Sequence, residues 1–341
     1  MRTECGCEPK KYSVTRGEFM DLDGSFHLLS CPPEADRATS RRVFAIGKFD
    51  GLHIAHQAVL GRAVAVARDT DADPCLFTFT PHPRFALTGD TAYERLLTPL
   101  CERARAAHAY GMRDVFVATF DEIFRNQTAD EFVVNYLLPL KASHLVVGYD
   151  FRLGRRGAYG PDDLARIGQT LGIAVDTIAH VDFADAPVSS SAIRSHLAAG
   201  EVASVTAMLG RPYRLRGTVV VGDRRGRTIG FPTANLVLAE SFVLPRVGVY
   251  AVQCEVGGAS ARGMMNVGRR PTVYEQGDLT IEVHLLDYAQ DLYGCEMAVD
   301  LLGYVREERK FADVDELRTQ LFRDREAAVL WPAAPERDYK K

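Results

Sequence analysis

The stretch Gly226-Arg227-Thr228-Ile229-Gly230-Phe231-Pro232-Thr233-Ala234-Asn235 decides how the second half of this chain is interpreted. Thr233 and Asn235 are two positions apart, so their side chains leave an extended backbone on the same side. A hydroxyl beside an amide oxygen suits Mg²⁺, which usually arrives with nucleotide phosphates. Pro232 fixes its own φ and stiffens the approach. For Pro232–Asn235 alone, an ordinary loop with turn residues is the better interpretation. The surroundings, β-rich segments on both sides, shift the balance towards a Mg-nucleotide site.

Composition and charge limit the class of protein. The 341 residues are 47% hydrophobic and 25% charged, enough for two ordinary soluble domains. A formal net charge of −4 gives no reason to expect a nucleic-acid or membrane partner. We see no apolar run near the ~18 residues that span a bilayer and no secretory signal. Seven scattered cysteines suggest free thiols, so we expect a cytoplasmic protein.

The segment from Arg42 to about Val188 alternates apolar strand-like runs with amphipathic helical segments. This alternation predicts an α/β domain, a parallel sheet with helices on both faces. The expected strands are Val43–Ile46, Cys75–Phe79, Val115–Ala118, His144–Val147 and Ile173–Ile178. The expected helices are Gln57–Arg68, Cys101–Tyr110 and Ala129–Tyr136, followed by Ser191–Ala199 and Glu201–Leu209.

From Tyr213 onward, short β runs punctuated by Gly, Pro and Asn predict an antiparallel β-barrel, closed by a helix over Val314–Leu330. We therefore expect an N-terminal extension of unknown role over 1–40, with a short hairpin over Phe19–Leu29. An α/β domain would cover 41–210 and the barrel domain 211–341. The expected barrel strands are Tyr213–Val221, Val249–Val256, Gly263–Val267, Thr280–Asp287 and Met297–Tyr304.

The first expected strand runs directly into Gly47-Lys48-Phe49-Asp50-Gly51-Leu52-His53-Ile54-Ala55-His56, where a helix begins. The two glycines allow the backbone to turn sharply and approach a ligand. The start of a helix suits a phosphate, because free N–H groups and a positive dipole end lie there. His53 and His56 share one helix face and can donate hydrogen bonds to a phosphate under attack. The same spacing also fits a capping and a packed histidine.

This segment resembles the Gly-x-Phe-Asp-Gly-x-His-x-Gly-His signature of the adenylyltransferase domain of bacterial bifunctional FAD synthetases. Three further segments resemble the family in the same order, namely Thr78–Phe85, Val147–Gly154 and Val188–Arg194. The sequence departs from the family at Ala55, where the signature has Gly, and at Ser191, where it has Thr. The resemblance implies a nucleotidylyltransferase-like, Rossmann-like domain. It implies catalytic roles for His53, His56 and Arg194, ATP binding by Gly47, Phe49, Asp50, Gly51, Ser189, Ser190 and Ser191, and flavin binding by His82, Pro83, Asp150, Phe151 and Arg152.

The Pro-Thr-Ala-Asn run is similar to the signature of riboflavin kinases, and ordered matches continue across nearly the whole second domain. The resemblance implies that Thr233 and Asn235 hold Mg-ATP and that Glu282 is the catalytic base. Glu282 shares a strand face with His284, because the two are two residues apart. The resemblance also implies ATP binding by Gly222, Gly226 and Gly230, and flavin binding by Arg306.

Together the two resemblances imply an enzyme that phosphorylates riboflavin to FMN and adenylylates FMN to FAD, with ATP and Mg²⁺. Two alternatives stay open. One is a working riboflavin kinase whose altered first domain uses another nucleotide or a flavin analogue. The departure at Ala55 is the reason to consider it. The other is a binder that senses flavin or nucleotide. The sequence leaves the oligomeric state undetermined.

Overall fold

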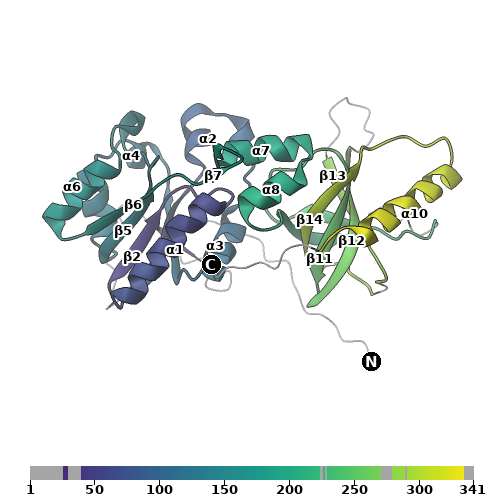
Figure 1. Cartoon of the computed structure of the whole chain (residues 1–341), viewed down its shortest axis with the longest axis horizontal. Helices are drawn as coiled ribbons and strands as arrows, with labels where there is room; N and C mark the ends of the chain where they lie inside the picture. The colour runs from purple at the N-terminus through teal and green to yellow at the C-terminus, as the bar shows by residue number, and fades with distance from the viewer. Residues whose placement is uncertain are drawn as a thin grey trace. The chain divides into compact units, whose positions relative to one another are not determined.

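The computed structural model describes residues 26–29, 40–222, 226, 229–269, 279–288 and 290–333. The chain divides after Ser190 into two compact units, which we take one at a time (Figure 1). The first holds a parallel sheet and the second a barrel, so the predicted fold classes are confirmed. The division places the two helices after Ser190 with the barrel. The domain limits 41–210 and 211–341 stay a prediction about functional units.

The first unit is built on a six-stranded sheet of order β1-β4-β3-β2-β5-β6, in which every pair is parallel. The strands are β1 His27–Leu29, β2 Arg42–Ile46, β3 Asp73–Thr80, β4 Asp114–Thr119, β5 Ala142–Gly148 and β6 Ala174–Ile178. The helices are α1 Ile54–Asp69, α2 Pro83–Thr88, α3 Leu100–Ala109, α4 Glu122–Arg125, α5 Ala129–Phe132 with a π-helical continuation Val133–Leu137, and α6 Pro161–Leu171. A short hairpin joins β7 Asp182–Phe183 to β8 Ala186–Pro187.

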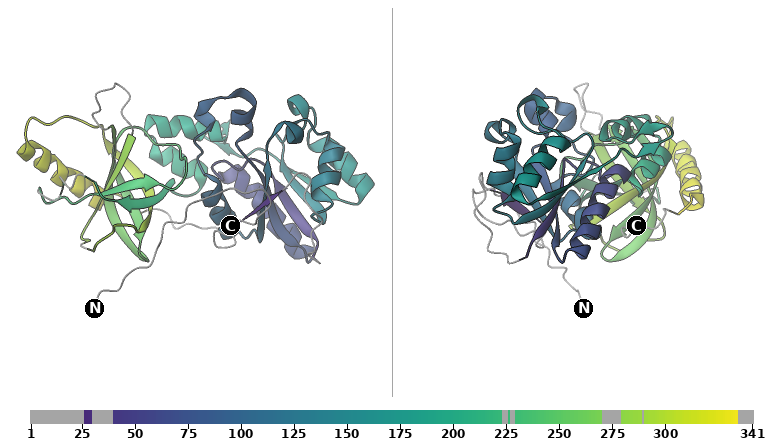
Figure 2. Two further views of the ribbon diagram at one scale, coloured as in Figure 1. Left: turned by 180° about the vertical axis from the view of Figure 1, so that it is seen from behind. Right: turned by 60° about the vertical axis from the view of Figure 1, so that its left-hand side comes forward.

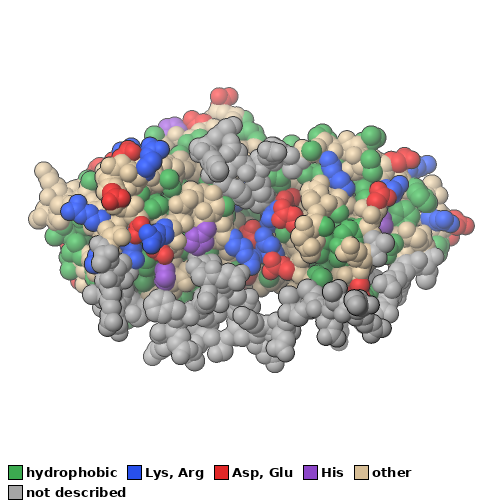
Figure 3. Space-filling model, turned by 90° about the horizontal axis from the view of Figure 1, so that it is seen from below, with side chains coloured by type: hydrophobic (Ala, Val, Ile, Leu, Met, Phe, Trp, Pro, Cys, Tyr) green, Lys and Arg blue, Asp and Glu red, His purple; other side chains and the backbone are tan. Residues whose placement is uncertain are grey.

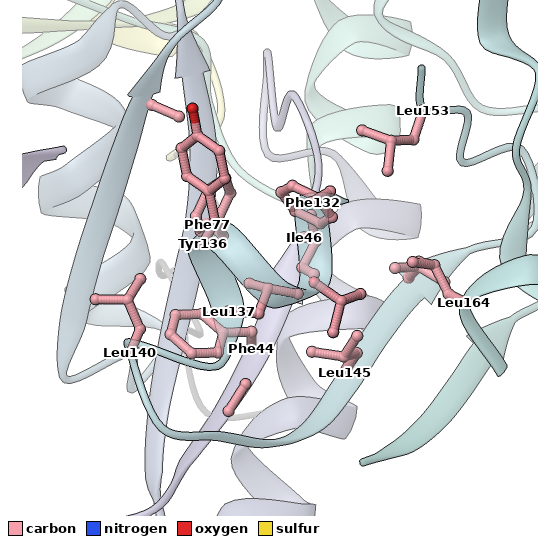
Figure 4. Close-up of a cluster of buried hydrophobic side chains, with 14 of the residues drawn as sticks. Phe44, Ile46, Phe77, Phe132, Tyr136, Leu137, Leu140, Leu145, Leu153 and Leu164 are labelled. Atoms are coloured by element: carbon pink, nitrogen blue, oxygen red, sulfur yellow. The ribbon is translucent and has the colours of Figure 1, made fainter. Parts of the chain in front are cut away.

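Helices cover both faces of this sheet, because alternate residues of each buried strand point to opposite sides. Val43 and Ala45 of β2 belong to a core that includes buried residues of α1 and α3. Phe44 and Ile46 belong to a second core with α5 and α6, where the rings of Phe132 and Tyr136 gather (Figure 4). Every residue of β2 is buried, which suits a central parallel strand.

Part of the N-terminal extension belongs to the sheet. His27–Leu29 forms β1 and pairs in parallel with β4. The His27 Nε2 atom lies 3.2 Å from Asp114 Oδ1, and this contact holds the pKa of Asp114 below its usual value. The proposed hairpin turn and residues 19–25 lie outside the described residues.

The second unit contains a closed antiparallel barrel of order β10-β13-β12-β11-β14-β9. Two helices precede it, α7 Ser190–Ala199 and α8 Val202–Leu209. The strands are β9 Arg214–Val220, β10 Ala234–Leu238, β11 Gly248–Val256, β12 Ala259–Arg269, β13 Leu279–Leu285 and β14 Glu296–Arg306, and the closing helix is α10 Val314–Leu330.

Helix α10 lies against the outside of the barrel, as Figures 1 and 2 show. Ala328 of α10 packs with Ala251 of β11 and Met264 of β12 in an outer hydrophobic cluster. The barrel interior is filled separately by inward residues such as Met265 and Val283, both almost fully buried. The outer face of the barrel therefore carries both a packed helix and, on neighbouring strands, the predicted polar residues.

Candidate active sites in the two units

Three predicted segments meet at one edge of the parallel sheet. Gly47–His53 follows β2, Thr78–Phe85 spans the end of β3, and Val147–Gly154 spans the end of β5. These three strands are neighbours, with Ile46 beside both Phe77 and Val147. The strand order also reverses at β2, since β3 lies on one side and β5 on the other. Open α/β sheets bind ligands at the carboxyl ends of strands beside such a reversal.

The loop between β2 and α1 has a left-handed backbone at two large residues. Phe49 has φ 53° and Leu52 has φ 45°, a conformation that side chains other than Gly rarely adopt. Both side chains are almost completely buried in the core under α1. Packing of these two side chains therefore stabilises the left-handed conformation of the loop that leads into α1.

Asp50, predicted to bind ATP, is buried and bonded to the protein. Its Oδ1 accepts hydrogen bonds from the backbone N–H groups of Leu97 at 2.8 Å and Thr98 at 3.1 Å. The Thr98 hydroxyl in turn accepts from the Gly51 N–H at 2.7 Å. These contacts show Asp50 fixing the loop, while any contact of Asp50 with ATP stays a prediction.

Thr78, Thr98 and Arg103 support this loop. Thr78 opens one of the segments that resemble the family but was given no role, and Thr98 and Arg103 were not identified from the sequence. The Thr78 hydroxyl donates to the Lys48 carbonyl at 3.1 Å, and Arg103 of α3 donates to that hydroxyl at 2.9 Å. The Arg103 guanidinium, buried with 2% exposed, also donates to the Thr98 carbonyl. Such a network depends on residues far apart in the chain, so no local pattern could reveal it.

His53 and His56 lie together at the start of α1. His53 is the N-cap, and its Nδ1 accepts a hydrogen bond from the His56 backbone N–H at 3.4 Å. The two rings stack with centroids 3.6 Å apart, and the Phe49 ring meets His56 edge-on at 5.2 Å. The pair therefore lies at a helix N-terminus, where backbone N–H groups favour an anion. Gly47 lies at the end of β2, with its N–H bonded to the Phe77 carbonyl.

His82 and Pro83 begin α2. His82 is the N-cap, accepting from the Arg84 N–H at 3.2 Å, and Pro83 occupies the first turn. The His82 ring lies 4.9 Å from the Tyr93 ring, and Arg84 donates to the Tyr93 hydroxyl at 2.9 Å. Both predicted flavin contacts thus belong to a short ordered helix after β3.

Asp150, Phe151 and Arg152 lie after β5 and differ in exposure. Phe151 is buried in the core shared with α5 and α6, whereas Asp150 and Arg152 are exposed. The Arg152 side chain donates to the Phe151 carbonyl at 2.8 Å. A Cβ added at Gly154 would lie 2.8 Å from the Gln127 carbonyl, so the backbone needs Gly there.

The predicted serines lie just before and within the start of α7. Ser190 donates to the Asp50 carbonyl at 2.8 Å, so the end of the first unit is fixed to the β2–α1 loop. Ser189 is half-buried in the same segment. Ser191 and Arg194 follow in α7, three residues apart and therefore on one helix face.

In the barrel, Asn235 and Glu282 are directly opposite each other. The antiparallel register of β10 and β13 pairs Asn235 with Glu282, and that of β12 and β13 pairs Asn266 with Glu282. Opposed residues share a face. Because the neighbouring Val283 is buried, the row formed by Asn235, Glu282 and Asn266 faces outward from the barrel. Thr233 immediately precedes β10 and is half-buried.

Glycines lie tightly against this row. A Cβ on Gly222 would lie 2.0 Å from Asn235 Nδ2, and one on Gly226 would lie 2.1 Å from the Phe231 carbonyl oxygen. Gly230 has φ 85°, which a side chain would strain. Gly is therefore required here for close approach or turning. The basic residues between Gly222 and Gly226 lie outside the described residues.

Arg306, predicted to bind flavin, is held by α10. Its guanidinium donates to both carboxylate oxygens of Asp324 at 2.7–3.0 Å, and Asp324 is 1% exposed. The same carboxylate accepts from Gln320 at 2.7 Å. This bidentate pair ties β14 to α10, and a flavin contact by Arg306 stays a prediction.

Surface charge agrees with the modest net charge. On the face shown in Figure 3, Lys and Arg side chains are interspersed with Asp and Glu among the described residues. None of the helices in the described part of the chain combines the length and apolar character needed to cross a bilayer.

Each unit matches its own family model. Residues 35–192 match the FAD synthetase model, and residues 209–331 match the riboflavin kinase model. A solved structure titled as a macrolide-efflux protein from Streptococcus pneumoniae shares the fold, with a TM-score of 0.83 and 30% identity. It covers 90% of this chain and 100% of its own.

Curated relatives match most of the chain. A bifunctional riboflavin kinase/FMN adenylyltransferase of Bacillus subtilis is 37% identical over 299 residues, which is 86% of this chain and 93% of the relative. The protein of the same name from Escherichia coli K12 is 38% identical, over 89% of this chain and 96% of its own. Because these relatives are more than 30% identical over most of both chains, this chain belongs to the bifunctional riboflavin kinase/FMN adenylyltransferase family.

Proposed function

We propose that the barrel unit phosphorylates riboflavin to FMN and that the α/β unit adenylylates FMN to FAD. The chain is a bifunctional enzyme of flavin cofactor synthesis, because a riboflavin kinase domain and a FAD synthetase domain cover it in succession. The pairing of Glu282 with Asn235 across β13 and β10 is the observation that carries the kinase site.

In the kinase reaction, Glu282 is the general base. It takes the proton of the riboflavin 5′-hydroxyl as that oxygen attacks the γ-phosphorus of ATP, and the bond to the ADP oxygen breaks. Phosphoryl transfer needs this positioned base and compensation of phosphate charge, with little covalent work by the protein. Asn235 is the direct register partner of Glu282 on the neighbouring strand, which suits a general base beside a phosphate-binding group.

ATP-dependent kinase and adenylyltransferase families imply a divalent metal, which we propose is Mg²⁺. Asn235 offers an amide oxygen opposite Glu282, and Thr233, two residues before it, offers a hydroxyl, so the two supply hard oxygens that fit Mg²⁺ with phosphates. When bound, the ion neutralises phosphate charge. Gly222 supports this role by leaving room for the Asn235 side chain.

In the adenylylation, an FMN phosphate oxygen attacks the α-phosphorus of ATP and pyrophosphate leaves. His53 and His56, at the N-terminus of α1, would stabilise charge on the reacting phosphate. Gly47, Phe49, Asp50 and Gly51 shape that loop. Ser189, Ser190, Ser191 and Arg194 would hold the remaining ATP phosphates, since Arg can bond two oxygens at once.

Flavin would be bound in the α/β unit by His82, Pro83, Asp150, Phe151 and Arg152, and in the barrel beside Arg306. The substrates and products are riboflavin, FMN, FAD and ATP. We place the enzyme in the cytoplasm, which the free thiols of Cys75 and Cys254 support.

A reciprocal pair of variants tests this assignment. Glu282→Gln should lose FMN formation by ~10²–10⁴-fold, because the amide keeps the shape but accepts no proton. It should still convert supplied FMN to FAD. His56→Ala should show the opposite pattern, accumulating FMN without FAD. Chromatographic separation of the flavins measures both, and near-normal riboflavin phosphorylation by Glu282→Gln would remove Glu282 from the mechanism.

A further inference from the structure

His284 lies beside the proposed catalytic base without being assigned a role. It is two residues after Glu282 on β13, and the buried Val283 and Leu285 flank it. Side chains two residues apart on a strand leave on the same side. His284 therefore projects from the outer face of the barrel, next to Glu282.

The ring of His284 contacts the Pro-Thr-Ala-Asn run directly. Its Nδ1 lies 2.8 Å from the Pro232 carbonyl oxygen. A carbonyl can only accept, so the ring carries its proton on Nδ1 and donates it. Burial lowers the pKa of His284. The neutral Nδ1–H tautomer is therefore the form present at neutral pH.

Two aromatic rings fix the orientation of this contact. The Phe231 ring centroid lies 5.1 Å from that of His284, and Phe231 also meets Phe322 of α10 edge-on at 5.1 Å. Phe231 is 3% exposed. The His284 imidazole thus packs on Phe231 and bonds the carbonyl of the next residue, Pro232.

We propose that His284 is a positioning residue of the kinase site, which holds the Pro232 carbonyl and thereby orients Thr233 toward the Mg-ATP phosphates. The Pro232 carbonyl and the Thr233 N–H belong to one planar peptide unit. The φ of Pro232 is fixed by its ring. Holding the carbonyl therefore sets the plane from which the Thr233 side chain departs. This inference rests on the proposed kinase function of the barrel.

Two variants of the full-length chain separate the hydrogen bond from the ring. His284→Phe keeps an aromatic ring and removes the donor, while His284→Asn keeps an N–H near the position of Nδ1 and removes the ring. Initial rates of FMN formation are measured while Mg-ATP and riboflavin are varied in turn. We expect His284→Phe to raise the KM for Mg-ATP by roughly 3- to 10-fold, the effect of one hydrogen bond, with the KM for riboflavin unchanged. His284→Asn should restore most of the affinity.

A matched control is available in the α/β unit. His108 also places Nδ1 against a backbone carbonyl, that of Met112, at 2.9 Å. His108→Phe should leave the kinetics of riboflavin phosphorylation unchanged. Thermal unfolding of all variants tests for a merely structural loss, which would lower the melting temperature and kcat without a selective change in KM.

Three results would overturn the inference. His284→Phe could match the wild type, both variants could raise the KM equally, or the loss could fall on stability and kcat alone. A wild-type chain that forms no FMN would instead overturn the proposed function itself, so the two failures are distinguishable.

Discussion

At the scale of single residues, the kinase site depends on space as much as on chemistry. A Cβ at position 222 would lie 2.0 Å from the Asn235 amide nitrogen, so the amide group can keep its place beside Glu282 only while that position has no side chain. Gly222 thus leaves the space that the amide group of Asn235, a proposed ligand of Mg-ATP, occupies.

We therefore expect Gly222→Ala to raise the KM for Mg-ATP in riboflavin phosphorylation. Overpacking of this kind costs ~1–3 kcal/mol, or roughly 5- to 150-fold in affinity. Gly61→Ala is the control, because a Cβ at that position of α1 meets nothing within 4 Å. Unchanged Mg-ATP kinetics in Gly222→Ala would mean that the position of Asn235 is unimportant for phosphate binding.

The positions and contacts of the candidate site residues were only partly predictable from the sequence. The pairing of Thr233 and Asn235 on one side follows from strand periodicity, and the position of His53 at a helix start follows from the glycines before it. The buried partners of Asp50 did not follow, because Leu97 and Thr98 lie in a loop almost fifty residues further along the chain. Arg306 could be located, whereas its bidentate partner Asp324 depends on how α10 docks.

At the scale of elements, α10 is the clearest case of local and long-range forces agreeing. The predicted helix Val314–Leu330 has the observed bounds, because Asp313 caps it by accepting from the Glu316 N–H. What holds it on the barrel is non-local. Asp324 is buried against Arg306, and this pair is the main polar link from α10 to β14 that we identify.

Breaking this pair should destabilise the protein strongly. Asp324→Asn leaves the Arg306 guanidinium without a charged partner, and removing one partner of a buried pair costs ~3–5 kcal/mol. Asp287→Asn is the control. The Asp287 side chain, which pairs with Arg325, is 81% exposed, and exposed ion pairs contribute ~0–1 kcal/mol to stability. Urea unfolding compares the two free energies. Similar small losses in both variants would show that α10 is held by its apolar contacts alone.

Several elements were missed or only partly predicted, for different reasons. The strand β10, Ala234–Leu238, was not identified because it follows closely on the loop residues up to Pro232, and only its pairing with β9 and β13 defines it. The helix α6 was overlooked although Pro161 begins it and Gly172 ends it. The strand β1 lies within the expected second arm of the hairpin, but its parallel pairing with the distant β4 was not predicted.

At the scale of the whole molecule, the two activities should be separable. Helix α8 groups with the barrel, and its Val205 and Leu209 are buried. A fragment from Ser191 to Lys341 should therefore phosphorylate riboflavin and be more stable than one from Arg211, which lacks those contacts. Calorimetry and FMN formation measure both properties. If the longer fragment folds and binds riboflavin but makes no FMN, the kinase depends on the α/β unit.

The central claim is that one chain carries out both reactions in sequence. The most direct measurement incubates the purified full-length protein with riboflavin, Mg²⁺ and either ATP, CTP or GTP, and separates the flavins over time. Because Ala55 stands where the family signature has Gly, the choice of nucleotide is part of the test. We predict that ATP gives FMN first and then FAD, with pyrophosphate released in the second step. Riboflavin left unchanged, or FMN that never becomes FAD with ATP, would contradict the account.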